Sequence, residues 1–161
     1  MLASCALDGR TGHEAGRALL AQLYGEATGQ PLPPIVIGEW GKPEFAYSGW
    51  HFSISHTKNH AFCVLAKVNV AIDAEELDRW INPALAEKIL SPMEKTQFDA
   101  AADKNKALLI FWVLKEAAAK LSGRGLRGYP NDTDFSLEDP RVRELEGCLV
   151  AIFIEGETYA V

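Results

Sequence analysis

The sequence has few cysteines and no long hydrophobic run. Its three cysteines, Cys5, Cys63 and Cys148, are far apart, odd in number and outside any CxxC or Cys/His cluster. Such unpaired thiols are typical of a reducing compartment. The longest uninterrupted apolar run, Ala107 to Leu114, is too short to span a bilayer. The segment Leu2 to Cys5 is similar to a lipoprotein processing site, but no charged or apolar stretch precedes it. We therefore expect a cytoplasmic protein with no membrane partner.

An excess of positive charge is also missing. The chain has 16 Lys and Arg against 22 Asp and Glu, a net charge of −6. Nonspecific nucleic-acid binding needs a basic field, so no nucleic-acid partner is expected. An anionic partner would have to meet a local patch, and Lys115, Lys120, Arg124 and Arg127 form one such basic cluster.

What is present is an ordinary globular composition. The chain has 161 residues, 48% of them hydrophobic and 24% charged. This is enough to bury one sizeable core, in one or two small domains. No low-complexity tract or internal repeat is evident.

The first half of the chain is predicted to hold one helix and several strands. Apolar spacing favours a helix from Gly12 to about Gly25, before the break at Pro31 to Pro34. Extended segments are then expected to begin at Ile35 and to cover 51–55, 61–67 and 69–75.

The second half is predicted to hold helices followed by strands. Asn82-Pro83 and the capping box Ser91-Pro92-Met93-Glu94 predict two helix starts, and a third helix is expected from Asp103 to Gly123. Glu94 most simply caps its helix, and an outer role near a metal is the alternative. Closing strands are expected at 134–137, 148–155 and 158–161. This order of strands, helices and strands favours an α+β fold.

Two segments supply the residues for phosphate chemistry. The strand ending in Asp73 and Glu75 places both carboxylates on one face, because strand side chains alternate. Glu116 and Lys120 are one helical turn apart and also share a face. Carboxylates suit a hard cation such as Mg²⁺, and lysines suit the phosphates that accompany it. The sequence therefore predicts an enzyme that acts on phosphate groups.

Four segments, in this order, carry a resemblance to a known family: Gly41-Lys42-Pro43, Phe52-Ser53-Ile54-Ser55-His56-Thr57, Val70-Ala71-Ile72-Asp73-Ala74-Glu75 and Trp112-Val113-Leu114-Lys115-Glu116-Ala117-Ala118-Ala119-Lys120. The chain resembles the 4′-phosphopantetheinyl transferases of the type that activates peptide and polyketide synthases. Each segment alone is a weak match, whereas four in the same order and spacing are specific. The resemblance covers roughly residues 12 to 126, and the chain looks like a compact member.

The resemblance implies a fold of two similar α+β halves packed as a pseudo-dimer. We place them at residues 1–68, on the coenzyme A side, and 69–161, with the metal site and long helix. It also implies transfer of phosphopantetheine from coenzyme A to a serine of an acyl or peptidyl carrier protein, which releases 3′,5′-adenosine bisphosphate. The basic cluster is then a candidate surface for docking an acidic carrier.

The same resemblance implies roles for individual residues. Asp73, Glu75 and Glu116 would hold Mg²⁺, with Mn²⁺ as an alternative, and Glu116 or a water molecule would take the serine proton. Lys120 would neutralise the pyrophosphate. The remaining coenzyme A contacts would come from Lys42, Pro43, Ser55, His56 and Lys115. Arg10 and Arg17 are alternatives for the adenosine phosphate.

One substitution and the chain length depart from the family pattern. Ala71 stands where the family usually has glycine, and members of this type are commonly longer. A noncatalytic coenzyme A-binding protein of the same fold is therefore a second hypothesis. A third is an unrelated Mg²⁺-dependent phosphohydrolase that needs no carrier protein.

Overall fold

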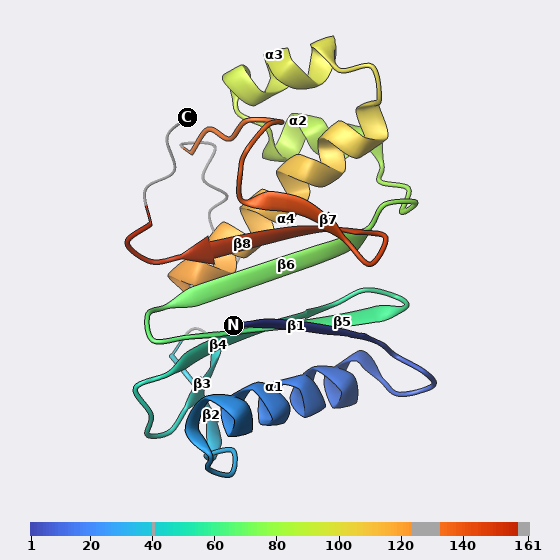
Figure 1. Cartoon of the computed structure of the whole chain (residues 1–161). Coiled ribbons are helices and arrows are strands. Elements are labelled where there is room, and N and C mark those ends of the chain that lie inside the picture. Colours follow the sequence, from blue (N-terminus) through green and yellow to red (C-terminus); the bar gives the residue numbers. More distant parts are fainter. Residues whose placement is uncertain (40, 124–132, 158–161) are drawn as a thin grey trace.

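The computed structural model describes residues 1–39, 41–123 and 133–157. Four layers follow one another in Figure 1: helix α1 (Gly12–Thr28), a first β-sheet, a second β-sheet, and helix α4 (Lys104–Ser122). The α+β class expected from the sequence is confirmed.

The first sheet is antiparallel, with the strand order β1 (Leu2–Ala6), β5 (His60–Ala66) and β4 (His51–His56). Helix α1 covers its outer face. The helix begins at Thr11, which forms a capping box with Glu14, and ends at Gly29, whose φ of 68° suits glycine. A small second hairpin, β2 (Ile35–Ile37) with β3 (Pro43–Phe45), lies beside this layer.

The second sheet is also antiparallel, with the order β6 (Val70–Glu76), β8 (Cys148–Ile154) and β7 (Val142–Leu145). Helix α4 packs on its outer face. Asp103 caps the start of α4, and Gly123, with φ of 72°, caps its end. The 3₁₀ turn η1 (Pro83–Leu85) and the helices α2 (Ala86–Ile89) and α3 (Pro92–Ala100) cover the far side of α4.

The two sheets meet through apolar side chains and a polar seam. Phe62 and Val64 of β5 pack in one cluster with Ile72 of β6 and Val150 of β8. Beside this cluster, the Ser53 hydroxyl accepts a hydrogen bond from the Ile72 N–H at 3.1 Å. The Ser55 hydroxyl likewise accepts from the Ala74 N–H at 3.2 Å. At this edge of β6, which is buried but pairs with no described strand, serine hydroxyls of β4 rather than backbone carbonyls accept the hydrogen bonds.

Most of the expected elements are present. Both capping signatures at Ser91 and Asp103 start helices where predicted, and strands β2, β4, β5 and β6 lie near their expected positions. Strands β1, β3 and β7 were not expected from the sequence. The closing strand expected at 158–161 lies outside the described residues. None of the described helices has the length and apolar character needed to cross a membrane.

The prediction of a strand at 134–137 is wrong. This stretch is irregular because side chains take up its backbone donors. The Phe135 N–H donates to the Glu94 carboxylate at 3.0 Å, and the Leu137 N–H donates to the Gln97 side chain at 3.0 Å. A segment whose N–H groups are held by helix α3 cannot pair with a sheet through the same groups.

Candidate active site

A pocket of about 320 Å³ lies between β4, β6 and α4. It collects most of the predicted site residues. Those that line it are Ser55, His56, Asp73, Glu75, Glu116 and Lys120, together with Ile54, Ala74, Arg79 and Trp112.

Two periodicities bring these side chains to one place. Strand alternation sends Ile72 and Ala74 into the cluster between the sheets, which leaves Asp73 and Glu75 on the face toward α4. On α4, Trp112, Glu116 and Lys120 are spaced by four residues and form one stripe. The strand face and the helix stripe meet at the pocket.

Asp73 is a buried carboxylate with one oxygen engaged. Its Oδ1 accepts from the Lys120 ammonium at 2.7 Å and from the Ser55 hydroxyl at 3.1 Å. Its Oδ2 is buried and has no hydrogen-bond partner among the residues that the structure describes. Burial raises the pKa of Asp73, and the Lys120 ammonium opposes that shift.

Glu75 is held by two groups that sequence reasoning did not assign to the site. The Trp112 indole N–H donates to Glu75 Oε1 at 3.1 Å, and the Arg79 guanidinium forms an ion pair with the same oxygen. Arg79 follows Glu75 by four residues, and Trp112 precedes Glu116 by four. Their spacing alone did not distinguish these contacts from ordinary surface pairs or core packing.

Glu116 lies half-buried beside the other two acids. Burial is the largest cause that raises its pKa to about 7, and the charge of Asp73 adds to it. Lys120 acts in the opposite direction. A carboxyl group with a pKa near neutrality can hold or release a proton under physiological conditions.

The donor set of this pocket fits a hard divalent cation. It offers the oxygens of three carboxylates, one of them buried without a hydrogen-bond partner among the described residues. Burial, and after it the neighbouring charge of Asp73, raises the pKa of Glu116. The three acids are spread along the pocket rather than drawn together: they are not among the described groups whose ligand atoms all lie within 4.8 Å of one another. Lys120 partly neutralises Asp73 in this arrangement.

A second, more apolar pocket of about 380 Å³ adjoins the acidic one and shares Ile54, His56 and Lys120 with it. Lys42 and Pro43 line it, as does Arg17. The Lys42 ammonium donates to the Asn69 side chain at 2.6 Å, and burial lowers the pKa of Lys42. Arg10 instead donates to the carbonyl oxygens of Ala6 and Leu7, at 3.0 and 3.1 Å, and lines neither pocket.

The structure does not bring Lys115 into either pocket. Its side chain is fully buried and pairs with the fully buried Glu94 at 2.8 Å, between α4 and α3. An ammonium without solvent access cannot contact coenzyme A or a docking partner, so both expectations for Lys115 are corrected. Glu94 forms the predicted capping box with Ser91. Arg124 and Arg127 lie outside the described residues.

Comparison with known proteins relates the chain to a family and to a curated relative. The family model described as the 4′-phosphopantetheinyl transferase superfamily matches residues 69–156, which include β6, α4 and β8. The chain is also 32% identical over 122 residues to the 4′-phosphopantetheinyl transferase HetI of Nostoc sp. (strain PCC 7120 / SAG 25.82 / UTEX 2576). That match covers 70% of this chain and 52% of the relative, so the chain spans about half the length of the curated relative it matches.

Proposed function

Since the chain belongs to the 4′-phosphopantetheinyl transferase superfamily, we propose that it transfers 4′-phosphopantetheine from coenzyme A to a serine of an acyl or peptidyl carrier protein, with release of 3′,5′-adenosine bisphosphate. One observation carries the proposal. Three carboxylates and Lys120 line a pocket that adjoins a second one lined by Lys42, Pro43 and His56.

Asp73, Glu75 and Glu116 would hold Mg²⁺ or Mn²⁺ through their carboxylate oxygens. When bound, such an ion would supply a positive charge that stabilises the pyrophosphate of coenzyme A as it is cleaved and the adenosine bisphosphate leaves. Lys120 extends from α4 to the junction of the two pockets and would neutralise a further phosphate charge. Glu116, a carboxylate that lines the same pocket as Lys120, would take the proton of the carrier serine.

The larger pocket would hold coenzyme A. Phe52 and Ile54 offer apolar walls for the pantetheine or the adenine, while Lys42, His56 and Arg17 offer donors for phosphate oxygens. Ser55 takes a supporting part, because its hydroxyl is already engaged with Asp73 and Ala74. Of the two arginine alternatives, the pocket lining favours Arg17.

We also propose that the two sheets with their helices are the similar halves of a pseudo-dimer, divided near residues 68 and 69. The support is their matching construction, since each has a three-stranded antiparallel sheet with one long helix on its outer face. The coenzyme A pocket takes residues from both, because Phe52 precedes this boundary and Lys120 follows it.

The function is tested by incubating the purified chain with coenzyme A, Mg²⁺ and several apo carrier proteins, and then measuring intact mass. A carrier heavier by one phosphopantetheine supports the proposal. Bound coenzyme A without any mass shift would favour the noncatalytic alternative. Phosphopantetheine released in the absence of a carrier would favour the hydrolase.

The Glu116→Gln variant tests the proposed base. It is expected to retain coenzyme A binding, measured by calorimetry, and to lose transfer by about 100-fold or more. The exposed Glu138→Gln variant is the matched control. Transfer at the wild-type rate by Glu116→Gln would contradict the assigned role.

A further inference from the structure

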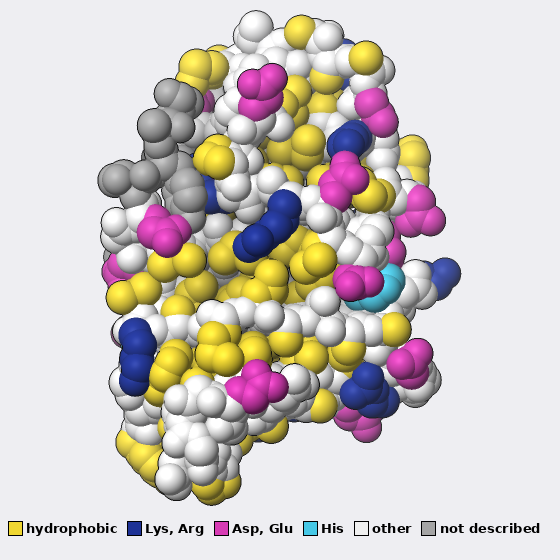
Figure 2. Space-filling view, viewed as in Figure 1, with side chains coloured by type: hydrophobic (Ala, Val, Ile, Leu, Met, Phe, Trp, Pro, Cys, Tyr) yellow, Lys and Arg dark blue, Asp and Glu magenta, His cyan; other side chains and the backbone are white. Residues whose placement is uncertain are grey.

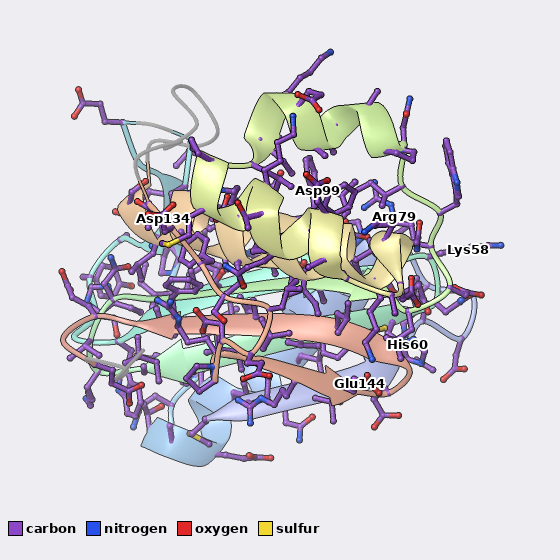
Figure 3. The ribbon with its side chains drawn as sticks, turned by 90° about the horizontal axis from the view of Figure 1, so that it is seen from above. Lys58, His60, Arg79, Asp99, Asp134 and Glu144 are labelled. Carbon is purple, nitrogen blue, oxygen red and sulfur yellow. The ribbon has the colours of Figure 1, made fainter. Side chains whose placement is uncertain are left out.

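A second group of metal-ligating side chains lies outside both pockets. His60 Nδ1, a Glu76 carboxylate oxygen and Cys148 Sγ all lie within 4.8 Å of one another. His60 begins β5 in the first sheet, Glu76 ends β6 and Cys148 begins β8 in the second. Figure 3 shows His60 at one end of the sheet layers, on the side of Lys58, Arg79 and Glu144 and away from Asp134.

Strand register explains why this group is separate from the candidate active site. Glu76 and Cys148 are directly paired in the β6–β8 ladder, so their side chains lie on the same face. That face is opposite to the one carrying Glu75, because adjacent residues of a strand alternate. Glu76 therefore faces the first sheet and His60, whereas Glu75 faces α4.

We propose that His60, Glu76 and Cys148 form a binding site for a transition-metal ion of the Zn²⁺ class, which would fasten the two sheets together at this end. Imidazole, carboxylate and thiolate ligands favour Zn²⁺ over Mg²⁺, whose preferred ligands are all oxygens. On binding, the ion replaces the Cys148 thiol proton, which passes to solvent. The two metal sites thus differ in the chemistry of their donors.

The distances fit such an ion without rearrangement of the backbone. Tetrahedral Zn²⁺ with ordinary bond lengths separates a nitrogen from an oxygen ligand by about 3.4 Å and from a sulfur ligand by about 3.6 Å. The corresponding separations here are 3.6 Å from His60 Nδ1 to Glu76 Oε1 and 3.8 Å from His60 Nδ1 to Cys148 Sγ. The same nitrogen and oxygen lie within ion-pair distance of each other, so a bound ion would replace a direct contact between the imidazole and the carboxylate.

Neighbouring groups orient the carboxylate. The Thr57 hydroxyl donates to Glu76 Oε1 at 2.6 Å, and the Asn59 N–H donates to the same oxygen at 3.1 Å. Supporting hydrogen bonds of this kind are characteristic of ligating carboxylates. Cys148 is fully buried, while His60 and Glu76 are partly exposed, which leaves an entry path and room for water as a fourth ligand.

The test uses Co²⁺ as a spectroscopic probe of the full chain. A Cys5→Ser/Cys63→Ser background leaves Cys148 as the only thiol, and excess Mg²⁺ occupies the acidic pocket. One equivalent of Co²⁺ is expected to produce a thiolate-to-cobalt absorption band that Zn²⁺ abolishes by displacement. Glu76→Gln and His60→Ala should each weaken Co²⁺ binding by about tenfold or more, and circular dichroism would show that both variants fold.

A matched pair of thiol variants makes the outcome specific. Cys148→Ser should abolish the band, whereas Cys63→Ser alone should retain it, since Cys63 is equally buried but packs in the core beneath α1. A missing band in the folded background protein, or one that persists without Cys148, would overturn the proposal. Because the readout does not depend on phosphopantetheine transfer, its failure is distinguishable from failure of the proposed function.

Discussion

At the scale of single residues, a few side chains have different surroundings although they are neighbours in the sequence. Lys115 and Glu116 are adjacent on α4, but Lys115 is sealed against Glu94 and Glu116 faces the acidic pocket. Adjacent helical residues differ in direction by about 100°, so they cannot share an environment at the edge of a cleft. The role of a charged residue on α4 therefore depends more on the helix face it occupies than on its charge.

Glu116 predicts a pH dependence of stability in the absence of divalent cations. Its pKa is about 7 in the folded protein, above the ordinary value of 4.5. Between these values the folded state keeps a proton that the unfolded state has lost, so the free energy of unfolding should fall as pH rises through this window. The measurement is urea denaturation from pH 4.5 to 8 in EDTA.

The Glu116→Gln variant isolates this contribution. Its free energy of unfolding should decrease less with rising pH over the same window. At pH 8 the variant should be more stable than the wild type by on the order of 1–2 kcal/mol. Parallel pH profiles for the two proteins would contradict the raised pKa of Glu116.

At the scale of elements, close packing between a helix and a strand limits the size of the side chains that the helix can have at the contact. A Cβ atom at Gly16 of α1 would lie 2.5 Å from Ile54 Cγ2 on β4. At Gly25 of the same helix, nothing lies within 4 Å of such an atom. Packing against β4 thus requires glycine at Gly16 but not at Gly25, although both glycines lower the intrinsic helix propensity of α1.

This contrast predicts opposite effects of the same substitution. Gly16→Ala should destabilise the protein by about 1–3 kcal/mol, since the added methyl group forces Ile54 to move. Gly25→Ala should stabilise it by about 0.5–1 kcal/mol. Thermal denaturation of both variants checks the pair, and stabilisation by Gly16→Ala would show that α1 and β4 are less closely packed.

The junction of α3 and α4 depends on a buried ion pair. Lys115→Met leaves the buried Glu94 charge without its partner and should cost about 3–5 kcal/mol. The exposed pair of Lys95 and Glu87, at 2.5 Å, offers the matched control, because Lys95→Met should cost less than about 1 kcal/mol. Equal losses for the two variants, measured by chemical denaturation, would refute the distinction.

At the scale of the whole molecule, the two sheets meet where the pockets open. Figure 2 shows hydrophobic side chains over the middle of one face of the molecule, with basic and acidic side chains among and around them. Lys42 and Asn69 add a polar link between the layers, since the Asn69 amide also donates to the Leu121 carbonyl at 2.9 Å. The relative position of the sheets therefore controls the shape of the site.

The serine seam between the sheets is expected to contribute to stability. Ser53→Ala would leave the buried Ile72 N–H without its acceptor and should lower the free energy of unfolding by about 1–3 kcal/mol. Ser136→Ala removes an acceptor from an exposed N–H and should change it by less than about 0.5 kcal/mol. A neutral Ser53→Ala, measured by urea denaturation, would mean that water replaces the hydroxyl.

The sequence by itself determined the starts of α3 and α4, the end of α4, the α+β class and the family, whereas α1 runs on to Thr28, beyond its expected end near Gly25. Capping at Ser91, Asp103 and Gly123 acts through backbone groups a few residues away, so local sequence suffices to place these ends. The alternation of Asp73 with Glu75 and the helical spacing of Glu116 with Lys120 likewise follow from local geometry, and the pocket collects all four.

Only the tertiary structure decided what each polar group faces across elements. In the folded protein, Lys115 is buried against Glu94, and Trp112 and Arg79 hold Glu75. The segment 134–137 stays outside the sheets because its N–H groups bind side chains of α3. The tertiary structure also brought His60 beside Glu76 and Cys148, which are distant in the chain. Apart from the local pair of Glu75 and Arg79, these contacts join residues far apart in sequence. They therefore depend on how the layers stack, and no local pattern encodes that arrangement.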